Sequence, residues 1–136
     1  MTEKQHNILF TTILMVCVVL IFVLKAPYRN FIPIVWGGIG FALYSILMLM
    51  TWINLSKILI NEHKDELLKM RIRFYDSRLN MSVDMVSLFK NKRKIIGISD
   101  EIKIKLSYFQ TFLRLSIIAF IMFAVLGVLT VVITWK

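Results

Sequence analysis

The chain has 136 residues and carries 17 Lys and Arg against 8 Asp and Glu, which gives a formal net charge of +9 at pH 7. Hydrophobic residues make up 58% of the sequence and its mean hydropathy is +0.74, whereas soluble domains contain roughly 45–50% apolar residues. This composition argues against an ordinary water-soluble domain. The single cysteine, Cys17, excludes a disulfide framework within the chain and a paired-cysteine metal or redox site.

Three long runs of the sequence contain no charged residue: residues 8–24, 31–55 and 115–135. A helix needs about 20 apolar residues to cross a hydrocarbon core of roughly 30 Å, and lipid cannot hydrogen-bond an exposed backbone. The sequence therefore predicts an all-α membrane protein with three transmembrane helices. We interpret the first run as a retained span and not as a signal peptide, because the stretch after Leu24 offers no small-residue cleavage site.

Residues 1–55 are predicted to form an N-terminal transmembrane hairpin made of the first two spans. In the second span Gly38, Ala42 and Ser45 recur at positions i, i+4 and i+7, which share one helix face. Membrane helices associate through close backbone approach and hydrogen bonds, because lipid competes equally for apolar side chains. We therefore expect this strip to pack against another helix, and the first span to face lipid.

The segment between the second and third spans, residues 56–110, holds 12 of the 17 basic and 7 of the 8 acidic residues. Because Lys-rich and Arg-rich loops stay on the cytoplasmic side, this segment and the N-terminus are predicted to be cytoplasmic. Tyr28, Trp36 and Trp135 would then mark the outer interface and Trp52 the inner one. Heavy use of Ile, Lys, Asn and Phe is typical of an AT-rich genome, bacterial or phage. The predicted location is the bacterial cytoplasmic membrane.

The cytoplasmic segment is predicted to be a helical hairpin. Residues 56–80 contain no Pro or Gly, so the second helix should continue unbroken from residue 32 to residue 80. Four apolar residues recur at intervals of seven and would form a coiled-coil-like assembly seam along it: Ile60, Leu67, Phe74 and Met81.

A further helix is predicted to return from this hairpin to the membrane. Ser99, followed by Asp100 and Glu101, has the pattern of an N-cap with acidic residues in the first helical turn. The helix that starts there would lead into the C-terminal transmembrane helix of residues 111–136.

Two stretches of the cytoplasmic segment leave a strand open as an alternative. Residues 69–74 and 101–106 alternate polar and apolar residues, the period of a β-strand, and could pair as a small antiparallel sheet. Helix is the preferred interpretation, because a lone β-hairpin is marginal in water and both stretches adjoin predicted helices without turn residues. Polar segments of about 55 residues also rarely build a core of their own.

A basic cluster near the return of the hairpin has the clearest binding chemistry. It consists of Lys90, Lys92, Arg93 and Lys94. Such a cluster suits anionic lipid headgroups, which attract each nearby Lys or Arg by about 1 kcal/mol. The plainer interpretation is a solvated turn that helps to fix the membrane topology. Nucleic acid is the least favoured ligand, because no aromatic residues are interleaved with the charges.

The third span carries a second strip of small and polar residues: Ser116, Ala119, Gly127, Thr130 and Thr134. Their alternating spacing of three and four matches one helix face. Two interpretations stay open, namely helix packing within or between chains, and the lining of a pore built from several copies. No ionisable residue interrupts the three uncharged runs, which disfavours a proton-coupled transporter or a voltage sensor.

The sequence offers no catalytic motif. His63 and Glu66 lie three residues apart beside Glu62 on a predicted helix, but two adjacent ligands are too few for a metal site. We therefore expect no catalytic residue, no cofactor and no bound metal, and the chain is not predicted to be an enzyme.

The function predicted from these patterns is that of a small integral membrane subunit of an oligomeric assembly, with the lipid bilayer as its surroundings. The chain would form homo-oligomers, and its basic cytoplasmic hairpin would contact other copies or a cytoplasmic or membrane protein partner. The alternative is a homo-oligomeric pore or channel former of a lytic or defence type, with the third span lining the pore.

Overall fold

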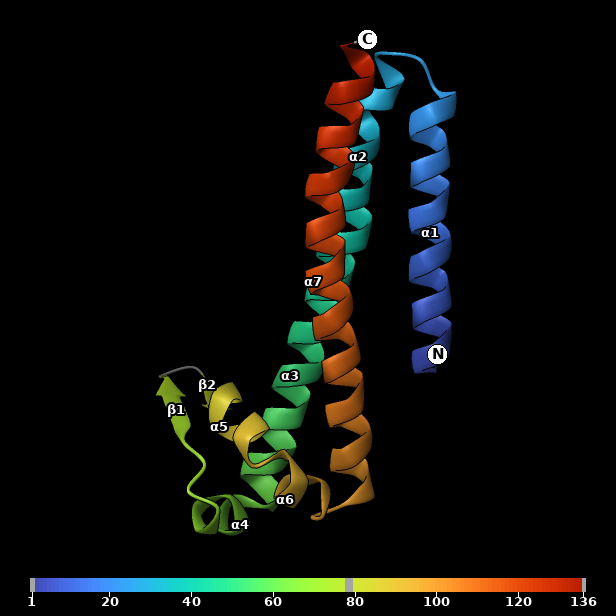
Figure 1. The fold of residues 1–136 in the computed structure, drawn as a ribbon. Coiled ribbons are helices and arrows are strands. Elements are labelled where there is room, and N and C mark those ends of the chain that lie inside the picture. Colours follow the sequence, from blue (N-terminus) through green and yellow to red (C-terminus); the bar gives the residue numbers. More distant parts are fainter. Residues whose placement is uncertain (1, 78–79, 136) are drawn as a thin grey trace. The chain divides into compact units, whose positions relative to one another are not determined.

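The structure is a computed structural model that describes residues 2–77 and 80–135. It is predominantly helical and divides into two compact units (Figure 1). The first, here called the span unit, consists of Met1–Met48 and Thr111–Lys136, and the second, the loop unit, consists of Leu49–Gln110. The all-α class predicted from the sequence is confirmed, with one small β-hairpin added to it.

Three helical stretches are long and apolar enough to cross a membrane: Glu3–Val23, Tyr28–Glu62 and Asp100–Thr134. The first is α1 (Glu3–Val23) and the third is α7 (Asp100–Thr134). The second is assembled from four consecutive elements, η1 (Tyr28–Phe31), α2 (Ile32–Trp36), the π-helical turn η2 (Gly37–Phe41) and α3 (Ala42–Glu62). Their length and composition support the predicted integral membrane class, and each contains all but at most the last residue of one uncharged run of the sequence.

Local hydrogen bonds explain where two of these helices begin. Thr2 and Gln5 cap the N-terminus of α1 reciprocally, each side chain bonding to the other's backbone. Ser99 precedes α7, and its Oγ accepts a hydrogen bond from the backbone N–H of Ile102 at 3.2 Å. The N-cap predicted at Ser99 is therefore confirmed.

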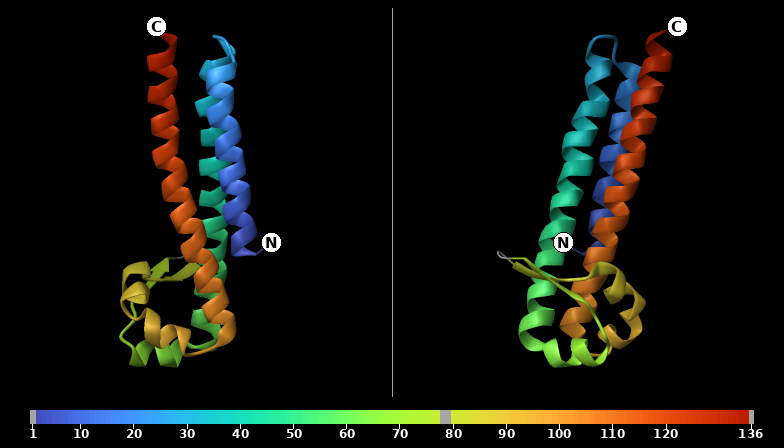
Figure 2. Two further views of the ribbon diagram at one scale, coloured as in Figure 1. Left: turned by 45° about the vertical axis from the view of Figure 1, so that its right-hand side comes forward. Right: turned by 90° about the vertical axis from the view of Figure 1, so that its left-hand side faces the viewer.

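Contacts at both ends of the span unit show that its helices alternate in direction. At one end Thr111 Oγ1 donates to Glu3 Oε2 at 3.0 Å, so the start of α1 lies beside residue 111 of α7. At the other end Thr134 Oγ1 lies 3.4 Å from Asn30 Oδ1, beside the connection that follows α1. The views in Figure 2 show α1, the α2–α3 stretch and α7 running alongside one another within this unit.

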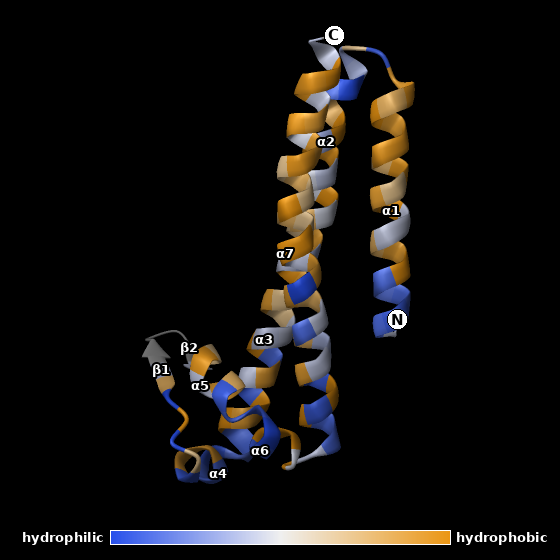
Figure 3. Ribbon diagram, in the orientation of Figure 1, coloured by the Kyte–Doolittle hydropathy of each residue, from blue (hydrophilic) through white to orange (hydrophobic). Residues whose placement is uncertain are grey.

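The loop unit contains the remaining elements. These are α4 (Lys64–Lys69), β1 (Phe74–Ser77), β2 (Asn80–Val83), α5 (Met85–Lys90) and α6 (Lys92–Ile96). The two strands pair antiparallel, with Phe74 opposite Val83 and Ser77 opposite Asn80. Figure 3 shows α4 and α6 as largely hydrophilic ribbons, in contrast to the apolar helices α1 and α2.

The prediction of one unbroken helix from residue 32 to residue 80 is wrong. The helix ends at Glu62, α4 follows after His63, and α4 itself stops at Lys69. Arg71 there adopts the left-handed conformation with φ of 56°. Its N–H bonds to Leu68 O and the N–H of Ile72 to Leu67 O, both at 3.0 Å, which is the Schellman pattern of a helix C-terminus.

The two stretches that alternate polar and apolar residues adopt different structures. Residues 101–106 lie in α7 and are helical, as preferred from the sequence. Residues 70–73 are not helical and lead into β1, so the helix preferred over residues 69–74 is wrong beyond Lys69. The partner of β1 is β2 and not residues 101–106. The described residues between α3 and α7 therefore form short helices and a β-hairpin, in place of the predicted helical hairpin.

The loop unit has an apolar core, contrary to the expectation from its short length. Among the described residues of this unit, ten apolar side chains are buried to 3% exposure or less: Leu55, Leu59, Leu67, Ile72, Val83, Leu88, Ile95, Ile102, Leu106 and Phe109. Five of these ten belong to α3 and α7, the helices that continue into the second and third spans. Helices α3 and α7 thus supply half of the core of the loop unit.

The predicted assembly seam is not a single line on one helix. The structure distributes its residues over α3, α4, β1 and β2, in the order Ile60, Leu67, Phe74 and Met81. Leu67 is fully buried in the loop unit, whereas Ile60 and Phe74 are half-buried. The side chain of Met81 lies outside the described residues. A coiled-coil seam through these positions has no continuous helix to carry it.

Candidate functional site

One serine from each small-residue strip of the second and third spans meets the other within the chain. Ser45 Oγ and Ser116 Oγ lie 2.8 Å apart and share a hydrogen bond. Three residues further along α7, the buried carbonyl of Ala119 accepts a hydrogen bond from Trp36 Nε1 at 3.0 Å. The helix-packing interpretation of Ser45, Ser116 and Ala119 therefore describes contacts inside the chain.

The hydroxyls further along the third span bond mainly to their own helix. Buried Thr130 donates to Leu126 O at 2.7 Å, and Thr134 donates to Thr130 O at 2.8 Å. Ser116 and Thr130 are only 6% and 5% exposed in a single chain. Of the three polar residues suggested as pore lining, only Thr134 is exposed.

The glycines of the spans fall into two kinds. A Cβ at Gly37 would lie 2.9 Å from Cδ2 of Phe123, and one at Gly40 would lie 3.0 Å from the ring of Trp36. These two glycines permit close packing within the chain. A Cβ at Gly38 or Gly127 would meet nothing within 4 Å. Sequence spacing selected the open pair but missed Gly37, because its partner lies 86 positions away on α7.

Aromatic residues fill the interior between the three spans. Phe10 packs edge-on against both Trp36 and Tyr44, with ring centroids 5.2 and 5.4 Å apart. The hydroxyl of Tyr44 donates to His6 O at 3.2 Å, and the His6 ring packs on Phe112 at 4.9 Å. Trp36 is buried among these rings, so its side chain packs within the chain, and its place at the outer interface stays a prediction. Sequence reasoning missed this cluster because its members come from three separated helices.

A groove lies at the end of the span unit where the connection after α1 meets the C-terminal turn of α7. Its volume is about 300 Å³, and its lining includes Asn30, Pro33, Gly127, Thr130 and Thr134. The open face of Gly127 therefore borders a concave surface that is partly polar. Ala42, the remaining member of the small-residue strips, is half-buried on α3.

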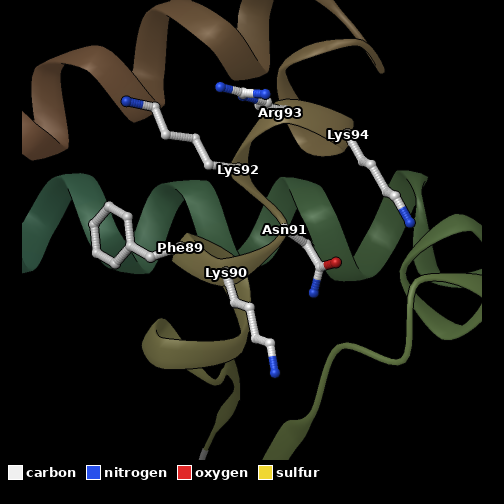
Figure 4. A pocket seen from close by; sticks show the side chains of 6 residues that line it. All are labelled: Phe89, Lys90, Asn91, Lys92, Arg93 and Lys94. Carbon is white, nitrogen blue, oxygen red and sulfur yellow. The ribbon is translucent and has the colours of Figure 1, made fainter.

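The basic cluster of the loop unit forms a pocket of about 450 Å³, drawn in Figure 4. Its lining consists of Phe89, Lys90, Asn91, Lys92, Arg93 and Lys94. Lys92 Nζ donates to Gln110 Oε1 at 2.8 Å, and Asn91 Nδ2 donates to Ser87 O at 3.0 Å. Within the described part of the chain, Lys90, Arg93 and Lys94 have no carboxylate partner.

Three aromatic rings connect the floor of this pocket to α3 and α7. Phe89 stacks on Phe109 with ring centroids 5.9 Å apart and an interplanar angle of 27°. Phe109 in turn lies 5.1 Å from Trp52 on α3. The pocket is thus fixed by both a hydrogen bond and ring packing to residues 109 and 110 of α7.

The weak metal candidate of the sequence forms an ordinary surface pair. His63 Nδ1 lies 3.6 Å from Glu66 Oε2, and both side chains reach solvent. Over residues 2–77 and 80–135 the structure brings together no group of three or more His, Cys, Asp or Glu that could hold a metal ion.

Comparison with known proteins adds no relative to this description. The chain matches no family model, no curated protein sequence and no solved structure. What it does must therefore be argued from its own residues, and the two features with the clearest chemistry are the open glycines of the spans and the basic pocket.

Proposed function

We propose that the protein is a subunit of an oligomeric assembly in the membrane, in which copies of the chain contact one another through their spans. The observation that carries the proposal is the pair Gly38 and Gly127. Both lie in membrane-spanning helices, and the space that a Cβ would occupy is open at each. Neither glycine is needed for packing within the chain, which leaves its backbone accessible to another helix.

Open glycine positions suit association in lipid for a physical reason. Apolar side chains gain little by leaving lipid for another helix, so membrane helices associate where backbones approach closely. Gly38 is followed by Ala42 at the four-residue spacing of a small-xxx-small pair. Gly127 borders the groove that also contains Thr130 and Thr134, where a neighbouring helix would find both space and hydroxyl groups.

The loop unit would face the cytoplasm in this proposal, because it carries most of the Lys and Arg residues of the chain. Its buried core makes it a folded extramembrane part, able to offer a defined surface to other copies or to a protein partner. The bacterial cytoplasmic membrane is the proposed location. A pore would require the same oligomer, and no contact among the described residues favours it over a purely structural subunit.

The proposal is tested by replacing the open glycines. Gly127→Leu and Gly38→Leu each add a large side chain to a surface that touches nothing in the same chain. We expect either substitution to reduce the detergent-stable oligomer, measured by cross-linking and native mass spectrometry, because the backbones can no longer approach. Leucine is also a better helix former than glycine, so a loss of helix would not explain the result.

A matched control lies next to Gly127 on the same helix. Val128 is 65% exposed, so Val128→Leu also adds bulk to the surface of the third span. It should leave the oligomer unchanged. If the Gly127, Gly38 and Val128 variants all give the wild-type oligomer, the glycine faces are not contacts between copies.

A further inference from the structure

We propose that the basic pocket of the loop unit binds the phosphate of an anionic lipid headgroup at the membrane surface. The pocket is lined by residues 89–94 and has a volume of about 450 Å³, within the range of small-ligand sites. This inference does not depend on whether the protein is an oligomer.

The first argument is unbalanced charge. Four cationic side chains line the pocket and no acidic side chain does. Among the described residues of the loop unit, the ion-paired carboxylates are Glu66, which pairs with His63, and Glu101, which pairs with Lys105. Within that part of the chain Lys90, Arg93 and Lys94 have no carboxylate partner, so the positive charge of the pocket is unbalanced and attracts an anion.

The second argument is that part of the pocket is held in place while part is free. Lys92 is bound to Gln110, and the Asn91 amide is bound to Ser87 O. Among the described residues Lys90, Arg93 and Lys94 have no bonded partner, and Figure 4 shows Lys90 and Lys94 pointing to one side of the ribbon and Arg93 to the other. Arginine can offer two parallel N–H donors to a phosphate, and lysine supplies a compact charge.

The third argument is the position of the pocket's contacts in the sequence. Phe89 and Lys92 contact Phe109 and Gln110 of α7. The third uncharged run begins at Leu115, five residues after Gln110 in the sequence. Lipid phosphates occupy the zone just outside the hydrocarbon, so cations held next to the start of an uncharged run suit such a ligand.

The aromatic residues beside the pocket favour a lipid over a soluble phosphate. Trp52, Phe109 and Phe89 form a continuous contact next to the end of the second span, and tryptophan is enriched at membrane interfaces. Phe89 also lines the pocket itself, where its apolar ring would contact the glycerol and upper acyl carbons of a lipid. A free phosphate has no apolar part to use this surface.

The test measures lipid binding to the full-length protein by native mass spectrometry in neutral detergent. Phosphatidylglycerol is titrated against the wild type and against the triple variant Lys90→Gln, Arg93→Gln and Lys94→Gln. We expect the apparent association constant to fall by roughly 100-fold, because each of the three charges contributes about fivefold near an anionic surface. Binding of phosphatidylcholine, which has no net charge, should be weak in both proteins.

A control with the same change in net charge separates the pocket from general electrostatics. Lys64, Lys69 and Lys103 are exposed lysines of the loop unit outside the pocket. Their replacement by Gln should leave phosphatidylglycerol binding within about twofold of the wild type. An equal loss in the control triple and in the pocket triple would overturn the proposal.

Two further arms keep the test decisive. Lys90→Arg with Lys94→Arg preserves the charge and should retain binding, so a loss in this variant as well as in the Gln triple would also count against the pocket. Inorganic phosphate and glycerophosphoglycerol are added as soluble competitors. If either displaces the lipid at equal concentration, the ligand is a soluble phosphate and the lipid assignment is wrong.

Discussion

The span unit and the loop unit present opposite kinds of side chain at their surfaces. In the span unit large apolar side chains such as Phe22, Val23 and Val128 point outward, and are 61%, 69% and 65% exposed. Its interior includes the Ser45–Ser116 pair. In the loop unit the interior is aliphatic and aromatic, while the charged side chains lie at the surface. The two halves of one short chain are therefore built for two different solvents.

The difference shows which force can hold each unit together. Water drives apolar side chains into the core of the loop unit, at about 1.5–3 kcal/mol for each fully buried large side chain. Lipid provides no such force between helices, so the span unit depends on close packing and on hydrogen bonds between helices. The bonds from Trp36 to Ala119 and from Tyr44 to His6 are of this kind.

The largest effect is expected from a charge placed in the loop core. Leu67 is fully buried on α4, whereas its neighbour Leu68 is 54% exposed. Leu67→Asp should lower the free energy of unfolding of the loop unit by about 4 kcal/mol, because it removes an apolar side chain and buries a carboxylate. Hydrogen exchange of the full chain in detergent would show the loop amides exposed and the span amides still protected.

The neighbouring residue provides the control. Leu68→Asp introduces the same side chain one position along the same helix and should cost less than about 1 kcal/mol. Equal loss of protection in both variants would mean that the loop unit does not have the water-driven core described here.

A smaller effect is expected from adding a methyl group to the close-packed spans. Gly37→Ala would bring a Cβ to within 2.9 Å of the Phe123 ring, whereas Gly38→Ala meets nothing within 4 Å. Gly37→Ala should therefore destabilise the span unit by about 1–2 kcal/mol, and Gly38→Ala should be neutral or slightly stabilising. The measurement is thermal unfolding in detergent micelles.

A second substitution checks the cause. Phe123→Leu removes the ring that a Cβ at residue 37 would meet, so it should restore part of the stability lost in Gly37→Ala. If the Gly37 and Gly38 variants unfold at the same temperature, the interior of the span unit is looser than the contacts of Phe123 indicate.

The membrane class, the three spans and the start of α7 were all predictable from the sequence. The uncharged runs have a single plausible structure in lipid, and the cap at Ser99 depends only on residues within one helical turn. Side-chain spacing also pointed to Ser45 and Ser116, which bond to each other in the structure. It pointed as well to Ala119, whose carbonyl accepts a hydrogen bond from Trp36. These features are either local or imposed by the solvent.

The end of α4 was not predictable, because its usual signal is missing. A helix that ends in a Schellman motif generally has glycine in the left-handed position, and here Arg71 occupies it. The motif is stabilised by burial of Leu67 and Ile72, which depends on the fold of the whole loop unit. Without knowledge of this burial, the composition and spacing of residues 56–80 predict an unbroken helix with a heptad seam.

The hydrogen-bond partner of Trp36 also could not be predicted from the sequence. A tryptophan near the end of a span usually lies at the interface, but this one is buried and donates to Ala119 O, 83 positions away. Gly40 leaves room for its ring, since a Cβ there would lie 3.0 Å from it. Contacts between distant helices cannot be read from spacing on either helix alone.

The smallest predicted effect tests whether polar pairs stabilise the span interior at all. Ser45→Ala and Ser116→Ala each remove one hydroxyl from the pair that lies 2.8 Å apart. A double-mutant cycle in detergent should give a coupling energy of about 0.6 kcal/mol, the average for such bonds between membrane helices. The value is small because a serine that loses its partner can bond to a carbonyl one turn earlier in its own helix.

The Thr134–Asn30 pair offers a comparison, since its longer distance of 3.4 Å and its exposure to solvent should give a coupling near zero. A coupling as small for Ser45 and Ser116 would mean that shape alone holds the spans together, and the contrast between the two units would then rest on packing density instead of on hydrogen bonds.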